Sequence, residues 1–367
     1  MEGKFKMKKS LSVILVIVLM LALVVGCAKP AEAPVEPAPA PVEPVAEATG
    51  IVKLGLGAIT TIDSSKDLNG DVLPLGQVDT IMAAVGFDKD DKVVSLTIDS
   101  AQSKVNFDKD LQLTTDVKAE LKTKVELGDA YGMIKGSKIG KEWYQQIAEL
   151  EKWMVGKTVA EIKAMKVNSN VVPEEAELTS LVSISVDGYI AVVEKAFNTA
   201  VSLNSSAVKV GLGHNIDISK SKGLGKDAEG KEILPLAQVD TVMAATAFDA
   251  DGKVAGTFID NAQTKINFDN QGKVTTDKAG VFKTKVELGA EYGMIKASKI
   301  GKEWYEQAAA LGQWMVGKTV AEIKAMKTVE VDAAHPAVPD VAELTSLVSV
   351  SVEHYIDAIA EGFDKAK

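Results

Sequence analysis

Apolar and polar residues alternate in the first part of the chain in a way that predicts β-strands. Val94, Leu96 and Ile98 are separated by single polar residues, so their side chains would share one face of an extended strand. Residues 88–92 and 249–253 are rich in Asp and Lys, and the second stretch contains Asp-Gly, which is typical of hairpin turns. We therefore expect antiparallel strands before and after each of these two stretches.

Farther along the chain the apolar spacing changes to that of helices. One stripe steps by three or four residues and comprises Ile139, Trp143, Ile147, Leu150 and Met154. A second stripe has the same spacing and comprises Val182, Val186, Tyr189, Val193 and Phe197. Between them, Thr158-Val159-Ala160-Glu161 has the form of a helix capping box. Strands followed by helices predict an α+β fold.

This strand-then-helix pattern occurs twice. Residues 122–146 return, with few changes, as residues 283–307, which lie 161 positions later. Residues 153–166 return unchanged as residues 314–327. All four Trp residues pair at the same offset. The sequence therefore predicts two tandem domains, at 50–205 and 206–367, each with an antiparallel sheet followed by helices.

The repeat also tests candidate catalytic residues. A residue that serves an activity common to both domains should occur in both, but His214 corresponds to Ala58, His354 to Gly188, and His335 falls in an insertion. The chain contains no nucleotide-binding, hydrolase or zinc-protease signature. The Gly residues of the two GLG segments, 55–57 and 211–213, do not complete a dinucleotide fingerprint. An activity confined to one of the two domains stays open, but we predict no catalytic side chain and no metal site.

The N-terminus has the features of an export signal. Four Lys residues precede an apolar run over 11–25, in which Ser12 is the one polar residue and which is short for a membrane-spanning helix. The run ends in Val-Val-Gly-Cys27, which resembles a bacterial lipoprotein box, so residues 1–27 are predicted to direct export and Cys27 to be lipidated. We expect the protein to be anchored by lipid to the outer face of the cytoplasmic membrane. Residues 28–49 are rich in Pro, Ala and Glu and predict a disordered spacer.

Composition and charge exclude several classes of function. The formal net charge of −10 argues against nucleic-acid binding, which needs a basic face. All 41 basic residues are Lys, so the chain has no Arg to make a bidentate contact with phosphate or guanine. A single Cys excludes an internal disulfide, a Cys-based zinc site and an iron–sulfur cluster. Apolar residues make up 46% of the chain, which is ordinary for a globular protein.

Hydroxyl residues cluster before the last predicted helix of each copy, at 177–183 and 343–349. The free N–H groups at a helix start favour a phosphate group. The alternative is that Thr179 or Ser180 simply caps the helix. The residues themselves leave both interpretations open.

Six segments carry a resemblance to a known family. They are QVDTIMAAV, KVNFDKD, KTKVELGDAYGMIK, IGKEWYQQ, VGKTVAEIK and AELTSLVSISV, together with their second copies. Over residues 51–367 the chain resembles the FMN-binding domains of flavinylated lipoproteins that serve extracellular electron transfer in Gram-positive bacteria, of the peptide-pheromone-encoding lipoprotein A type. The lipoprotein box and the Pro-rich spacer fit the same architecture.

The resemblance implies that a flavin transferase links FMN through its phosphate to a serine hydroxyl, at up to two positions in the chain. Matched to the family's acceptor pattern, Asp-x-x-Ser/Thr-Gly-Ala-Thr/Ser, the attachment residues are Ser183 and Ser349. The accompanying cofactor-binding candidates are Glu177, Thr179, Ser180, Glu343, Thr345 and Ser346. The chain departs from the pattern at the acidic position, where it has Glu, and at the Gly and Ala positions, where it has Leu and Val.

Two further segments are candidates for the wall of a flavin site. They are Tyr131-Gly132-Met133 and Tyr292-Gly293-Met294. An aromatic ring and a thioether suit the face of an isoalloxazine, and Gly permits a close backbone approach. The alternative is ordinary core packing beside a turn. Trp143 and Trp153, with their second copies, lie on apolar stripes, so we expect them in the core.

These observations predict an extracellular electron carrier that holds FMN covalently and is better described as a carrier than as an enzyme. It would take electrons from a membrane dehydrogenase or a quinol-linked donor and pass them to extracellular acceptors. Two alternatives stay open at this point. One is a flavin-free binding or cell-wall lipoprotein with a duplicated domain, and the other is a flavin-dependent reductase.

Overall fold

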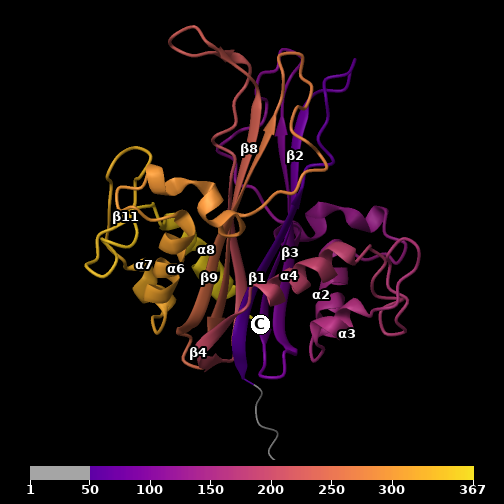
Figure 1. Ribbon diagram of the computed structural model, residues 1–367. Coiled ribbons are helices and arrows are strands. Elements are labelled where there is room, and N and C mark those ends of the chain that lie inside the picture. The colour runs from indigo at the N-terminus through magenta and orange to yellow at the C-terminus, as the bar shows by residue number, and fades with distance from the viewer. Residues whose placement is uncertain (1–49) are drawn as a thin grey trace, which may run out of the picture. The chain divides into compact units, whose positions relative to one another are not determined.

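The computed structural model describes residues 50–367, which lie within one compact unit of the chain (Figure 1). The export signal, Cys27 and the Pro-rich spacer lie outside the described residues. The main strands are β1 (Ile51–Thr61), β2 (Leu75–Phe87), β3 (Val93–Asn106), β4 (Val201–Ala207), β5 (Lys209–Asp217), β8 (Leu236–Phe248) and β9 (Val254–Asn267). Four shorter strands are β6 (Gly225–Lys226), β7 (Glu232–Ile233), β10 (Thr328–Val329) and β11 (Val338–Pro339).

The helices follow the strands in each half of the chain. In the first half, residues 50–207, they are α1 (Lys124–Leu127), α2 (Trp143–Met154), α3 (Val159–Lys163) and α4 (Asp187–Asn198). In the second half, residues 208–367, they are α5 (Lys285–Leu288), α6 (Trp304–Met315), α7 (Val320–Lys324) and α8 (Glu353–Asp364). The 3-10 turns are η1 (Gly128–Tyr131), η2 (Met133–Lys135), η3 (Gly289–Tyr292) and η4 (Met294–Lys296). The α+β expectation is confirmed.

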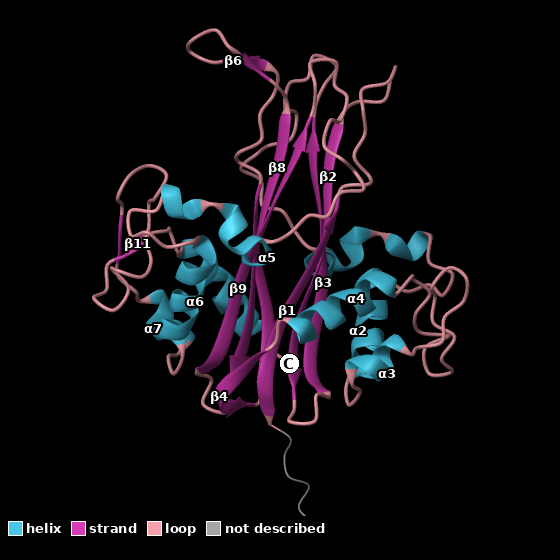
Figure 2. Cartoon of the chain, in the orientation of Figure 1, coloured by secondary structure: helices cyan, strands magenta, loops and turns pink. Residues whose placement is uncertain are grey.

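Two antiparallel sheets form the centre of the molecule, and helices cover their outer sides (Figure 2). The strand order is β3-β2-β1-β4 in one sheet and β5-β8-β9 in the other. The pairing of β8 with β9 repeats that of β2 with β3 at positions 161 residues apart. Both expected hairpin turns are present, and in each the first Asp carboxylate accepts backbone N–H bonds that close the turn.

The inner faces of the two sheets pack against each other through small residues. Their shared core includes Met82, Ala84, Met243 and Ala245. A second shared core lies farther along the strands, where the rings of Phe107 and Phe268 have centroids 5.1 Å apart. The polar residues that alternate with Val94, Leu96 and Ile98 are therefore buried too, because the second sheet covers them.

Each sheet packs against its helices through glycine. A Cβ atom on Gly57 would lie 2.1 Å from the carbonyl oxygen of Val192 in α4. One on Gly213 would lie 1.7 Å from the carbonyl oxygen of Ala358 in α8. The GLG segments thus allow a helix backbone to rest directly on a strand.

Two expected helix boundaries are wrong. The helix that the first stripe predicts begins at Trp143, after Ile139, where Glu142 provides the N-cap. The helix of the second stripe begins only at Asp187, so Val182 and the hydroxyl-rich segment lie in turns before it. The capping box of Thr158 and Glu161 is confirmed at the start of α3.

Candidate functional site

The first turn of α2 holds together the segments that the sequence singled out. Glu142 and Gln146 lie four residues apart, so they share one face of the helix, and both are almost fully buried. The carboxylate of Glu142 accepts the backbone N–H of Met133 at 2.8 Å and that of Ile134 at 2.9 Å. This carboxylate fixes the Tyr131-Gly132-Met133 segment against the helix start.

Gln146 makes the corresponding contact with the predicted attachment serine. Its Oε1 atom accepts the backbone N–H of Ser183 at 2.8 Å and lies 3.3 Å from the Ser183 hydroxyl. Its Nε2 atom donates to the carbonyl of Lys141 at 3.0 Å. Ser183 is half-buried. One helix turn therefore joins Ser183 to the segment that was predicted to wall a flavin.

The second half has the same arrangement at the start of α6. Glu303 accepts the backbone N–H of Met294 at 2.8 Å. Gln307 accepts the backbone N–H of Ser349 at 2.8 Å and lies 3.2 Å from its hydroxyl. The two serines are thus held in the same way although they occur in different parts of the chain.

Aromatic side chains and one lysine lie beside each of these helix starts. The ammonium of Lys124 lies 5.0 Å from the ring centre of Tyr131 and 5.4 Å from that of Trp143, within cation–π distance. The indole N–H of Trp143 donates to the hydroxyl of Tyr189 at 2.8 Å. Burial raises the pKa of Tyr189 to about 12, so this hydroxyl stays neutral.

The equivalent group in the second half has the same contacts. Lys285 lies 4.9 Å from the ring centre of Tyr292 and 5.2 Å from that of Trp304, whose indole donates to Tyr355. The expectation that Trp143 is core is confirmed, and Trp304 is equally buried. Trp153 and Trp314 are only partly buried, with a lysine over each ring.

Gly132 and Gly293 are required by the backbone in both halves. Each has φ of 74° and joins two successive 3-10 turns, in a left-handed conformation that favours glycine. Tyr131 and Met133 are half-buried and pack on the first-half helical core, as Tyr292 and Met294 do in the second half. Core packing therefore describes part of their role, and each side chain keeps a solvent-accessible portion.

The remaining predicted cofactor-binding residues are exposed and do not lie at a helix start, where the sequence predicted them. Glu177, Thr179 and Ser180 are exposed in turns, and the Thr179 hydroxyl donates to the carbonyl of Ala176. In the second half Glu343, Thr345 and Ser346 are also exposed.

Neither hydroxyl cluster is at a helix start, so both the helix-dipole argument for a phosphate and the alternative of helix capping are wrong. Val186 and Val352 are the N-cap residues of the last helices, and neither makes a side-chain capping hydrogen bond. The structure brings Ser183 and Ser349 to the helix start of α2 and α6 instead, through Gln146 and Gln307.

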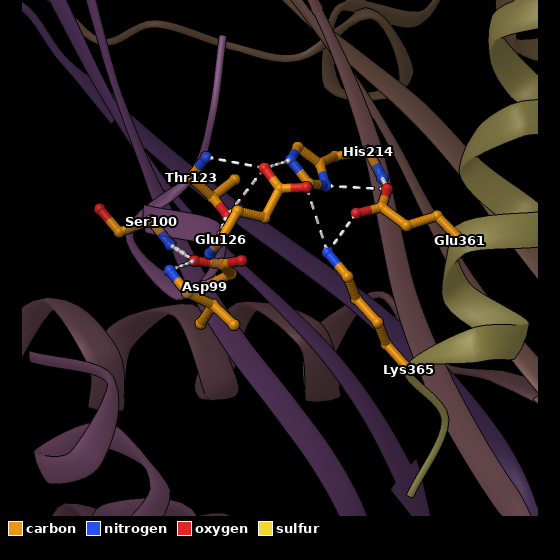
Figure 3. A network of polar contacts seen from close by, with 8 residues as sticks. Asp99, Ser100, Thr123, Glu126, His214, Glu361 and Lys365 are labelled. Atoms are coloured by element: carbon orange, nitrogen blue, oxygen red, sulfur yellow. Dashed lines mark hydrogen bonds and ion pairs between the residues drawn. The ribbon is translucent and has the colours of Figure 1, made fainter. Parts of the chain in front are cut away.

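A second polar cluster lies where the two halves meet, and the sequence analysis did not predict it (Figure 3). His214 on β5 has its Nε2 atom 3.1 Å from Glu126 of α1 and its Nδ1 atom 3.0 Å from Glu361 of α8. Lys365 forms ion pairs with both carboxylates, at 3.4 Å for Glu126. Two cations thus bridge two anions across the boundary between the halves.

The pKa values in this cluster favour the charged forms. Burial opposes protonation of His214, but hydrogen bonds to Glu126 and Glu361 outweigh it and raise the pKa of His214 to about 9. Burial also opposes ionisation of both glutamates, and the hydrogen bonds from His214 nevertheless hold their pKa values below the usual range. The cluster is therefore a neutral set of two positive and two negative charges near pH 7.

Glu126, His214 and Glu361 could in principle offer three ligand atoms to a metal ion, since these atoms lie within 4.8 Å of one another. However, both ring nitrogens of His214 already contact carboxylates, and Lys365 lies between the same two glutamates. The internal charges are balanced without a metal. The corresponding place in the other half has a simpler bridge, in which Lys195 pairs with Glu287 at 2.7 Å.

Within residues 50–367, no helix has the length and apolar character needed to cross a membrane. Comparison of the chain with protein-family models, curated proteins and solved structures gave no match.

Proposed function

We propose that this protein is an extracellular, lipid-anchored flavoprotein that carries electrons, with FMN attached covalently to Ser183 and Ser349. Each half would be one FMN-binding domain. The observation that carries the proposal is the contact made twice, in which a buried glutamine holds the backbone N–H and the hydroxyl of the predicted attachment serine. An ordinary surface serine has no need of such a fixed position.

The residues present suit an FMN group joined by a phosphoester. Ser183 offers a primary hydroxyl that is half-buried and oriented by Gln146. Tyr131 and Met133, held against the same helix start by Glu142, offer an aromatic ring and a thioether. Lys124 supplies a positive charge beside them, which favours an anionic group. Flavin, when bound, supplies the redox chemistry, and the protein supplies position and polarity.

The chain's own residues would position the cofactor. Gln146 and Gln307 fix the serines, Glu142 and Glu303 fix the Tyr-Gly-Met segments, and no side chain is needed to make or break a bond in a substrate. Proposed partners are a flavin transferase for maturation, a membrane dehydrogenase or quinol-linked electron donor, and extracellular acceptors. Lipidation of Cys27 would hold the protein at the outer face of the membrane.

Intact-mass measurement tests the proposal. Residues 48–367, which contain the compact unit, would be co-expressed with a flavin transferase and compared with the variants Ser183→Ala and Ser349→Ala. The proposal predicts two FMN mass increments, each lost with its own serine. Ser185→Ala is the matched control, because Ser185 is an exposed serine two residues away and lies outside the attachment pattern, so this variant should keep both increments. A folded protein with no increment, or increments that survive both substitutions, would overturn the assignment.

A further inference from the structure

A hollow beside the second-half strand β9 is independent of the two serine sites. It has a volume of about 390 Å³ and lies between β4, β9 and α6. Its walls are mostly apolar or small, and those the argument uses are Leu203, Ala255, Thr257, Ala308 and Gly312. The Leu203 side chain covers Gly256, where an added Cβ would lie 2.4 Å from it. This side chain closes one flank of the hollow.

The corresponding hollow in the first half is smaller, at about 320 Å³, and the Glu151 side chain and Lys367 occupy part of its wall. Ala255 corresponds to Val94, Ala308 to Ile147 and Gly312 to Glu151, each 161 positions earlier. In each of these three pairs the second-half residue is the smaller. Because buried apolar groups normally stabilise a fold, truncating several of them around one space costs stability unless something occupies the space.

Glu151 shows which chemical group the first half places there. Its Oε1 atom accepts the backbone N–H of Ile98 at 2.6 Å, and its Oε2 atom pairs with Lys367 at 2.6 Å. Ile98 lies opposite Ala83 in the edge strand β3. Because Glu151 of α2 accepts its N–H, that N–H lies on the open edge of β3, and a carboxylate oxygen satisfies it.

The second half leaves the same N–H group open. Ile259 lies opposite Ala244 in the edge strand β9, which is the equivalent register position. At Gly312, where the first half has Glu151, the α6 backbone reaches β9 so closely that a Cβ would lie 3.1 Å from the Thr257 carbonyl. Among residues 50–367, no side chain accepts the Ile259 N–H, which lines the hollow.

A hydroxyl group at the rim is also freed in the second half. In the first half the Tyr144 hydroxyl donates to Asp129 at 3.1 Å. The residues 161 positions later are Tyr305 and Ala290, so Tyr305 has lost that acceptor, and it lines the hollow. A mostly apolar space with two donors at its wall is typical of a site for a small molecule.

We propose that this hollow binds a small, uncharged and mainly apolar molecule whose carbonyl oxygen accepts the Ile259 N–H. The carbonyl takes the place that the Glu151 carboxylate has in the first half. An uncharged acceptor fits because no lysine lines the hollow, whereas Lys367 neutralises Glu151 in the first half. The apolar part of the ligand would fill the space beside Ala308 and Leu203.

The test compares three probes of one shape: 2-acetylnaphthalene, 2-ethylnaphthalene and 2-naphthoate. Their binding to flavin-free residues 48–367 would be measured by amide nuclear magnetic resonance. We expect 2-acetylnaphthalene to bind at least about tenfold more tightly than the other two and to shift the Ile259 amide proton downfield, since a hydrogen bond forms there. Equal binding of the ethyl compound, tighter binding of the naphthoate, or an unmoved Ile259 signal would overturn the proposal.

Two variants test whether the probe binds in the hollow. Ala308→Ile introduces the first-half residue and should reduce binding at least about tenfold by filling the space. Ala309→Leu also projects into the hollow but from an exposed position, so it should do the same without disturbing the core. Lys152→Gln, at the first-half equivalent of Gln313, is the control that leaves binding unchanged. Binding that survives both filling variants would contradict the site. This test involves neither serine nor flavin, so its outcome is independent of the proposed function.

Discussion

The Nε2 atom of His214 lies 3.1 Å from a carboxylate oxygen of Glu126, and this single contact joins β5 of the second half to α1 of the first. In the equivalent contact the first half supplies Lys195 of α4 and the second half supplies Glu287 of α5, so a lysine takes the place of the histidine. One of these two bridges thus contains a histidine, whose pKa is raised to about 9, and the other contains a lysine.

We expect stability to depend on pH through His214. Its pKa is raised to about 9 in the folded protein, so its stabilising effect is complete below about pH 6.5 and is lost as the pH rises through 9. The lowered pKa values of Glu126 and Glu361 act oppositely, and their effect is lost as the pH falls below about 4.5. The cluster should therefore stabilise most between about pH 4.5 and 6.5.

Urea unfolding at several pH values checks this expectation. The free energy of unfolding should fall by roughly 3 kcal/mol between pH 6.5 and 9.5, from the size of the pKa shift. His214 lines a surface hollow, and the variant His214→Ala leaves the other titratable groups around that hollow in place. Besides the members of its cluster, these groups are Lys118, Glu120, Asp217, His354 and Asp357. That variant carries the first-half residue and should lose most of the slope. An unchanged slope would show that other groups cause it.

Gly213→Ala should destabilise the fold severely. The added methyl group would overlap the carbonyl of Ala358 in α8, so the helix must move off the strand, at a cost of about 3 kcal/mol or more. Gly225→Ala is the matched control, because nothing lies within 4 Å of the new Cβ there. It should change the free energy of unfolding by less than about 0.5 kcal/mol, and similar losses in both variants would refute the packing argument.

Glu151→Ala should cost about 1–3 kcal/mol, because it leaves the buried Ile98 N–H without an acceptor. Glu151→Gln keeps an oxygen atom in place and should cost less. Thermal unfolding of the two variants distinguishes a lost acceptor from lost packing. If both variants unfold alike, the hydrogen bond to Ile98 contributes little.

Gln146→Leu should affect only the first serine site. The substitution preserves volume but removes the acceptor of the Ser183 N–H, so we expect most of the FMN increment at Ser183 to disappear while that at Ser349 remains. Gln307→Leu should give the reverse pattern. Peptide mass analysis after proteolysis separates the two sites. Loss of both increments from one substitution would indicate a general folding defect.

Much of the local structure follows from the sequence. Alternation located β3, Asp-rich stretches located the hairpin turns, and the Thr158 capping box located α3. The sheet-to-sheet packing does not follow, because it depends on alanines such as Ala84 and Ala245, which carry little signal in an apolar pattern. The start of α4 was placed too early because Val182 is buried in a turn and mimics the helical spacing.

Some residues of the candidate sites could be predicted from the sequence and others could not. Ser183 and Tyr131 were predicted from a resemblance, but Gln146 and Glu142, which connect them, are buried polar residues with no sequence signature of their own. His214 was set aside because it occurs in one half only. That difference from Ala58 was the available signal, because the repeated glutamate pairs with His214 in one direction and with Lys195 in the other.

The alanine-lined seam between the two sheets has a thermodynamic consequence. Neither inner face could be left in water without exposing a broad apolar surface, so the halves should unfold in one cooperative transition. A half produced by itself would therefore aggregate or pair with a second copy of itself. The two halves therefore form one folding unit whose parts depend on each other.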